Sequence, residues 1–153
     1  MWPIDYDVGT NPIGGVLPDI EKGMAMRFMM IVKADQDSEA GLPPKPELIA
    51  AIGKLSQHMA ETGVLVDTGG LLPSSQGARV RVSRGKMSVT DGPFAETKEL
   101  IGGYAIVETK SRDEAVELGK QFMDVHMTTL GFSYDGECEV RQLFDASHCG
   151  RES

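Results

Sequence analysis

A rigid turn leads directly into a β-strand in the segment Asp91-Gly92-Pro93-Phe94-Ala95-Glu96-Thr97-Lys98-Glu99-Leu100-Ile101-Gly102-Gly103-Tyr104-Ala105-Ile106-Val107-Glu108. Pro93 fixes its own φ angle and disfavours helical geometry at Gly92. The Asp91 carboxylate can accept hydrogen bonds from backbone amides further along the turn. We therefore expect an ordered turn at 91–94, followed by a strand at 103–108.

The chain before this turn begins with a strand and a helix. Residues 26–34 are apolar on both alternating faces, which predicts a strand covered on both sides. Residues 35–46 carry charges and prolines and predict a loop. Apolar side chains then recur with helical spacing, which predicts a helix from Glu47 to Gly63. This apolar stripe consists of Leu48, Ile52, Leu55 and Met59.

Short strands are predicted between this helix and the turn. Residues 64–66 begin a second strand, which the pair Gly69-Gly70 interrupts. Val80 and Val82 alternate with polar residues in a third strand. Gly85 turns this strand back into a short return strand at 87–90, which completes a hairpin.

A second helix and a final strand are predicted after the turn. Ser111-Arg112-Asp113-Glu114 has the pattern of a capping box and predicts the helix start. A last strand is expected from about residue 137 to 144. The order strand, helix, strands, helix, strand is a ferredoxin-like α+β pattern, with one antiparallel sheet and two helices on one of its faces. Because the other face needs cover, we expect a homodimer.

Residues 91–99 resemble the signature of the DGPF proteins, a branch of the YCII-related family. The resemblance extends, in the order of its elements, from about residue 26 to about residue 145. It implies that two such sheets pack together as a dimeric α/β barrel. The other matching segments are Arg27-Phe28-Met29-Met30-Ile31-Val32-Lys33, Gly63-Val64-Leu65-Val66, Gly69-Gly70-Leu71-Leu72-Pro73-Ser74, Gly77-Ala78-Arg79-Val80-Arg81 and Glu137-Cys138-Glu139-Val140-Arg141.

Three parts of the chain are expected. Residues 1–25 are rich in proline and glycine and are interpreted as an extended N-terminal arm. Residues 26–145 are the YCII-related (DGPF) domain, and residues 146–153 are a C-terminal tail. If the arm is ordered, its apolar side chains would dock it on its own subunit or on a neighbour. They are Trp2, Ile4, Tyr6, Ile13, Val16 and Leu17.

The composition limits the kinds of partner. The 153 residues suffice for one domain with a core, and 41% hydrophobic and 25% charged residues are ordinary globular values. A net charge of −8 disfavours direct nucleic-acid binding. No apolar run approaches the roughly 20 residues that span a bilayer, and a signal peptide is not evident. We therefore expect a cytoplasmic protein that does not bind membranes, with Cys138 and Cys149 as reduced thiols.

The candidates for acid/base catalysis are Asp91, His126 and Glu96. If the fold brings Asp91 and His126 to one cleft, the carboxylate can orient the imidazole for proton transfer. Some proteins similar to YCII are linked to a histidine and an aspartate that act as a proton relay, although the resemblance does not map those two positions onto Asp91 and His126. Structural alternatives stay open. Asp91 can build the turn through side-chain bonds, Glu96 can belong to a solvated loop, and His126 can cap the end of its helix.

The candidates for ligand binding are Arg81, Lys98 and Asp67. Arg81 lies on the polar face of a predicted strand, where it can hold an anionic ligand or form a cross-strand ion pair. Lys98 follows the turn, and Asp67 precedes Gly69-Gly70. No metal site is expected, because His148 and Cys149 lack further ligands nearby and His58 is interpreted as a surface residue of the first helix.

Two functions remain open from the sequence. Neither Gly69-Gly70 nor Gly102-Gly103 fits a phosphate or dinucleotide loop, so we expect no cofactor. One hypothesis is a cofactor-free enzyme of the lyase or isomerase type, acting on a small organic molecule in a cleft between sheet and helices. The other is a non-catalytic dimeric binding or regulatory module that contacts a sigma factor, since DGPF proteins are often associated with extracytoplasmic-function sigma factors.

Overall fold

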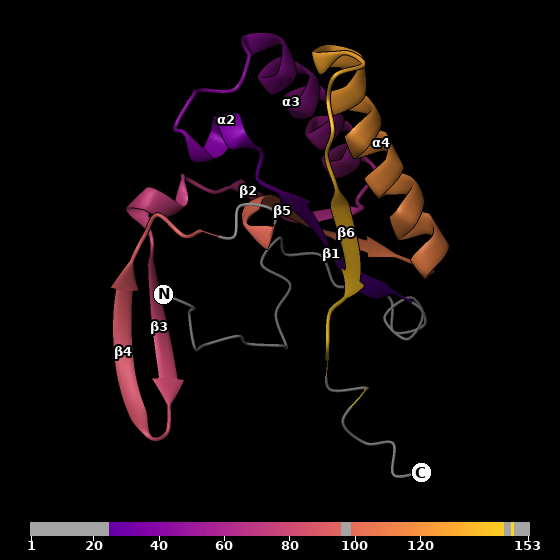
Figure 1. The fold of residues 1–153 in the computed structure, drawn as a ribbon. Helices are drawn as coiled ribbons and strands as arrows, with labels where there is room; N and C mark the ends of the chain where they lie inside the picture. The colour runs from indigo at the N-terminus through magenta and orange to yellow at the C-terminus, as the bar shows by residue number, and fades with distance from the viewer. Residues whose placement is uncertain (1–24, 96–98, 146–147, 149–153) are drawn as a thin grey trace.

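A computed structural model describes residues 25–95, 99–145 and 148, and it shows a mixed α+β fold (Figure 1). The predicted arm at 1–25 therefore falls almost entirely outside the described residues, as does most of the predicted tail. Helices α3 (Pro46–Glu61) and α4 (Arg112–Leu130) lie side by side over one face of the main sheet. The order of elements agrees with the ferredoxin-like pattern.

The main sheet has four antiparallel strands in the order β2-β5-β1-β6. The strands are β1 (Met26–Lys33), β2 (Leu65–Gly70), β5 (Ile101–Thr109) and β6 (Cys138–Gln142). β1 lies in the centre, with β5 and β6 as its two partners. The long, doubly apolar first strand predicted from the sequence is therefore confirmed as an interior strand of the sheet.

The core lies between this sheet and the two long helices. Phe28 pairs with Val107 and Met30 pairs with Ala105, and all four side chains are buried in one cluster. Met59 of α3 and Ala115 of α4 complete this cluster. Since side chains alternate along a strand, the neighbouring residues of β1 and β5 point to the opposite face of the sheet. These are Met29, Ile31, Tyr104 and Ile106.

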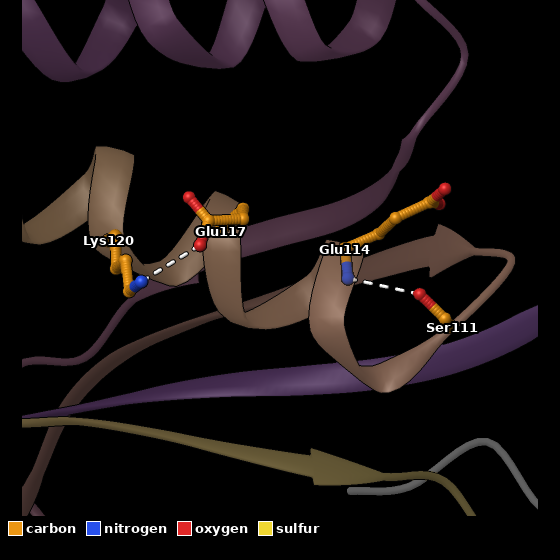
Figure 2. A network of polar contacts seen from close by, with 4 residues as sticks. All are labelled: Ser111, Glu114, Glu117 and Lys120. Atoms are coloured by element: carbon orange, nitrogen blue, oxygen red, sulfur yellow. Dashed lines mark hydrogen bonds and ion pairs between the residues drawn. The ribbon is translucent and has the colours of Figure 1, made fainter.

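The start of α4 partly follows the predicted capping box (Figure 2). Ser111 Oγ accepts a hydrogen bond from the Glu114 amide at 3.2 Å, as expected. The Glu114 carboxylate, however, accepts its bond from the Lys110 amide at 3.0 Å and not from Ser111. One turn further on, Lys120 Nζ donates to Glu117 Oε1 at 2.8 Å. This contact raises the pKa of the Lys120 ammonium group above its usual value.

Two local predictions were wrong. The predicted loop at 35–46 contains a four-residue helix, α2 (Gln36–Glu39), which Asp35 caps by accepting a bond from the Ser38 amide at 2.7 Å. Gly69 and Gly70 do not interrupt a strand but form the end of β2. A Cβ atom on Gly69 would lie 3.0 Å from the ring of Tyr104 on the neighbouring strand, so the missing side chain leaves room for this ring.

The predicted hairpin is present but does not belong to the main sheet, so the expectation of one sheet was wrong. β3 (Ala78–Ser83) and β4 (Lys86–Asp91) form a separate two-stranded sheet, which extends away from the main sheet (Figure 1). Its turn has positive φ angles at both central residues, 51° at Arg84 and 77° at Gly85. This geometry matches the right-handed twist of the two strands.

Candidate functional site

Ser74 lies at the centre of the best-defined polar cluster of the structure. It begins a short 3-10 helix, η1 (Ser74–Gln76), directly after Pro73, and it is 8% exposed. Its hydroxyl oxygen accepts a hydrogen bond from the Phe94 amide at 3.0 Å. The same hydroxyl donates to Glu39 Oε2 at 2.6 Å. Ser74 thereby connects the 91–94 turn to helix α2.

Glu39 is the carboxylate of this cluster. It lies at the end of α2, and its second oxygen, Oε1, accepts a hydrogen bond from the Ser74 amide at 2.7 Å. The Glu39 side chain therefore receives two hydrogen bonds from one residue. Hydrogen bonds to a charged acceptor are stronger than neutral ones, so this pair holds α2 firmly against η1.

The 91–94 turn packs tightly against the backbone of η1. The Gly92 amide donates to the Gly77 carbonyl at 2.9 Å, and the Gly77 amide donates to the Ser74 carbonyl at 2.9 Å. A Cβ atom on Gly92 would overlap this Ser74 carbonyl group. Glycine is therefore required at position 92 by close backbone approach. The peptide bond between Gly92 and Pro93 is cis.

Arg79 joins the turn from β3. Its guanidinium carbon lies 3.9 Å from the centroid of the Phe94 ring, which is a cation–π contact. Because the Phe94 amide is held by Ser74, the ring and the guanidinium group are placed together beside the turn. A positive charge is therefore fixed over an aromatic surface.

These groups line a cavity of about 540 Å³, which we call the Ser74 cavity. Its apolar wall combines leucines of the 71–72 segment with Phe94 and Ile101, and its charged groups are Glu39, Arg79 and Glu99. The full lining consists of Glu39, Gly70, Leu71, Leu72, Pro73, Ser74, Gln76, Gly77, Arg79, Phe94, Glu99, Leu100 and Ile101. Cavities that hold small molecules have this size and this mixture of apolar walls with a few polar groups.

Glu99 and Lys33 form an ion pair at one side of the Ser74 cavity. Lys33 Nζ donates to Glu99 Oε2 at 3.3 Å. The Glu99 side chain is 80% exposed, whereas the Lys33 side chain is 16% exposed. The carboxylate therefore lies at the mouth of the cavity, where a bound molecule can reach it.

The structure does not bring Asp91 and His126 together within one chain. Asp91 ends β4, whereas His126 lies on α4, at the other side of the molecule (Figure 1). The Asp91 side chain is exposed and makes no hydrogen bond to the described residues, so the predicted side-chain bonds of the turn are wrong there. Glu96 and Lys98 lie outside the described residues. Catalytic roles for all these residues stay predictions.

His126 does not cap its helix, contrary to the structural alternative considered for it. It lies one turn before the end of α4 and is buried, and Gly131 provides the helix terminus. Its Nδ1 lies 2.9 Å from the Phe122 carbonyl oxygen, which can only accept, so Nδ1 donates. The imidazole also contacts the rings of Phe122 and Tyr134, at centroid distances of 4.7 and 5.6 Å. The contacts in this chain are those of a packing residue.

The predicted ligand-binding residues lie apart from one another. Asp67 Oδ2 accepts a hydrogen bond from the Tyr104 hydroxyl at 3.3 Å, on the sheet face away from the helices. Arg81 is exposed on the hairpin, and neither residue lines the Ser74 cavity. Among the described residues, no three His, Cys, Asp or Glu side chains form a group that could hold a metal ion.

A second open cavity, of about 580 Å³, lies along α4 and the loop that follows it. It is bordered by Met123, Met127 and Tyr134 together with the acidic Asp124 and Asp135. Burial raises the pKa of the Tyr134 hydroxyl. Its hydrogen-bonded pair, Lys120 and Glu117, lies exposed on one helix, whereas the bonds around Ser74 join three segments of the chain, so the Ser74 cavity is the better candidate site.

The sequence analysis missed Glu39, Ser74 and Phe94 as site residues. Ser74 and Phe94 both lie in segments that carry the family resemblance. This resemblance was the feature of the sequence that could have marked them as site residues. No feature of the sequence marked Glu39 as a site residue, because it lies in a segment that was expected to be a loop. Arg79 also lies in one of the segments that carry the resemblance, but its contact with the Phe94 ring joins residues fifteen positions apart and has no local pattern.

Comparison with known proteins agrees with this architecture. The model of the YCII-related domain matches residues 26–124, from the first strand to the middle of α4. An uncharacterized protein of Rhizobium meliloti (strain 1021) is 33% identical over 92 residues, which cover 60% of this chain and 69% of the relative. The chain therefore belongs to the YCII-related family. None of the described helices is long and apolar enough to cross a membrane.

Proposed function

We propose that this protein binds a small organic molecule in the Ser74 cavity and performs cofactor-free acid/base chemistry on it. The observation that carries this proposal is the lining of the cavity. Segments far apart in the sequence, from α2, the 70–77 segment, β3 and the 94–101 segment, place two carboxylates and one guanidinium group around an apolar wall. Membership of the family does not indicate which reaction this protein would catalyse, since the relative named above is itself uncharacterized.

The charges of the cavity indicate which molecule would fit. Arg79 favours a ligand with an anionic or carbonyl oxygen, which its guanidinium donors can bind. Leu71, Leu72 and Ile101 favour an apolar body next to this group. Glu99 then lies within the site as an accessible carboxylate, the group that accepts or returns the proton.

Ser74 and Glu39 act as positioning residues in this proposal. The Ser74 hydroxyl already donates to Glu39 and accepts from the Phe94 amide, so both of its roles are used within the protein. It therefore fixes the Phe94 ring and, through it, the Arg79 guanidinium group. A nucleophilic role would require these bonds to break.

A homodimer is part of the same proposal. The sheet face that carries Met29, Ile31, Tyr104 and Ile106 has none of the described helices packed on it. A second copy that packs its own sheet on this face would form the dimeric α/β barrel. Sedimentation equilibrium should give twice the mass of one chain at micromolar concentration, and a monomer at that concentration would contradict this part of the proposal.

The ligand proposal is tested by binding measurements on purified protein. Native mass spectrometry should detect a co-purified small molecule, or a set of small carboxylic acids should raise the thermal midpoint. Arg79→Gln should weaken this binding by about tenfold or more, the change that about 1.4 kcal/mol represents, whereas Glu99→Gln should bind nearly as well as the unmodified chain, because Glu99 transfers the proton and does not hold the anionic group. Glu61→Gln, on an exposed part of α3 outside the cavity, is the matched control and should bind normally.

Two results would contradict the ligand proposal. One is that no small molecule changes the midpoint or the native mass. The other is that a molecule binds equally well to Arg79→Gln and Glu61→Gln, because its site would then lie elsewhere. A proton-transfer role for Glu99 further requires that Glu99→Gln retains binding better than it retains turnover.

A further inference from the structure

The β3–β4 hairpin has one face that is apolar except at its base, where Ala78 pairs with Asp91. Val80 pairs with Val89, and Val82 pairs with Met87, so the four side chains share one side of the two-stranded sheet. Each of them is between 66% and 72% exposed. The opposite side carries polar residues only, among them Arg81 and Ser88. The hairpin is therefore amphipathic with an uncovered apolar face.

This arrangement is unfavourable for an isolated chain. A two-stranded hairpin is at most marginally stable in water, and it requires further strands or another layer against it. Large apolar patches on a surface indicate a contact with a partner. The hairpin also extends away from the main sheet, as Figure 1 shows. Its base is held by the hydrogen bond between the Gly92 amide and the Gly77 carbonyl.

Charge indicates the kind of partner. The segment 78–91 contains four basic residues, Arg79, Arg81, Arg84 and Lys86, and one acidic residue, Asp91. The whole chain contains fifteen basic and twenty-three acidic residues, so the remainder has eleven and twenty-two. A basic hairpin thus extends from an acidic body. Three of the four basic residues, Arg79, Arg81 and Lys86, lie on the polar face, so the charge of the hairpin favours its approach to the acidic body of another copy while the apolar face makes the contact.

We propose that the apolar face of the β3–β4 hairpin packs on the body of a second copy of this chain, in a reciprocal exchange about a two-fold axis. Two-fold symmetry doubles the contact, because each hairpin covers the partner while its own body is covered. The inference rests on the homodimer proposed above. It adds that the hairpin is a part of the interface and not a free projection.

The test compares two single substitutions on opposite faces of the hairpin. Val82→Asp places a charge on the apolar face, and it should raise the dimer dissociation constant by roughly 100-fold, because a charge without a partner is costly in an apolar contact. Ser88→Asp places the same charge on the polar face and is the matched control. It should leave the dissociation constant unchanged in sedimentation equilibrium.

A second measurement uses the unmodified chain, since Val82→Asp would also weaken dimers by unfolding the hairpin. Backbone amide exchange of residues 78–91 should become faster when the protein is diluted below its dissociation constant. Exchange that is independent of concentration would overturn the proposal. A monomeric unmodified chain would overturn it together with the homodimer, whereas equal dimers of Val82→Asp and Ser88→Asp would overturn the hairpin contact alone.

Two further measurements show whether another part of the chain covers the hairpin and whether the ligand proposal fails by itself. Trp2 is the one tryptophan of the sequence. If Val82→Asp leaves the dimer intact but moves the Trp2 emission to longer wavelength, the hairpin is covered by residues 1–24, and the proposal is overturned. Ligand binding in the Ser74 cavity is measured on the same variants, so a failure of the ligand proposal is seen independently of the association state.

Discussion

The Ser74 hydroxyl accepts a hydrogen bond from the Phe94 amide at 3.0 Å, although twenty residues separate the two in the chain. Between them lie the whole β3–β4 hairpin and the turn that follows it. Together with the bond from the Gly92 amide to the Gly77 carbonyl, this contact closes the base of the hairpin, and it holds Phe94 where its ring meets the Arg79 guanidinium group. The polar groups that hold the turn thus also shape the cavity.

Gly92→Ala should strongly destabilise the fold. The added Cβ would overlap the Ser74 carbonyl group, and backbone must move to relieve it. We expect a loss of about 3 kcal/mol in the free energy of unfolding, at the upper end of the usual cost of overpacking. Gly53→Ala is the control, because that position in α3 has open space around it and alanine favours a helix. Urea unfolding of both variants checks this, and similar midpoints would contradict it.

Ser74→Ala should cost about 1–3 kcal/mol, because the half-buried Phe94 amide loses its acceptor and Glu39 loses one donor. Ser75→Ala, at the exposed neighbouring position, should be almost neutral. A double-mutant cycle of Ser74→Ala with Glu39→Ala should show clear non-additivity, since the two residues share two bonds. Additive effects would mean that the pair is not coupled.

Asp91→Asn and Asp91→Ala should have nearly equal stability. The Asp91 side chain is exposed and has no hydrogen-bond partner among the described residues, so neither replacement removes a structural bond. Surface changes of this kind usually stay within about 0.5 kcal/mol. Thermal unfolding of the two variants measures the difference. A clear loss in Asp91→Ala alone would restore the role of a turn former that the sequence suggested.

The stability of the protein should fall in alkaline solution. Burial raises the pKa of the Cys138 thiol above its ordinary value of 9.0, and burial is also the main cause that raises the pKa of Tyr134 above 10.0. The folded state therefore keeps protons that the unfolded state releases. This contribution is fully present below pH 9.0 and is lost as the pH rises through and beyond that value.

Unfolding of the unmodified chain and of Cys138→Ala across this range checks the alkaline effect. Cys138→Ala should lose less stability than the unmodified chain between neutral pH and pH 10, because one of the two groups is gone. The Cys138 thiol should also react slowly with alkylating reagents near neutral pH, because thiolate is the reactive form. Equal pH profiles for both proteins would show that Cys138 does not contribute.

The sequence alone predicted the elements whose signals are local. The doubly apolar strand at 26–34, the helical stripe from Leu48 to Met59 and the capping residue Ser111 were each recognisable within a few residues. The glycine of the hairpin turn was recognisable too, because a positive φ angle favours glycine at any such turn. The family also followed from sequence, since its segments occur in order along the chain.

Only the tertiary structure determined which of these segments meet. Glu39, Ser74, Arg79 and Phe94 have ordinary local environments in the sequence, and they line one cavity because α2, η1, β3 and the turn converge. Asp91 and His126, by contrast, lie on β4 and α4 and do not meet within one chain. Periodicity and capping depend on neighbours a few residues away, whereas a cavity depends on contacts between residues tens of positions apart. The physical reason is that the hairpin base packs against Ser74 and thereby fixes the distances between residues that are far apart in the chain. A pattern of neighbouring residues does not contain this information.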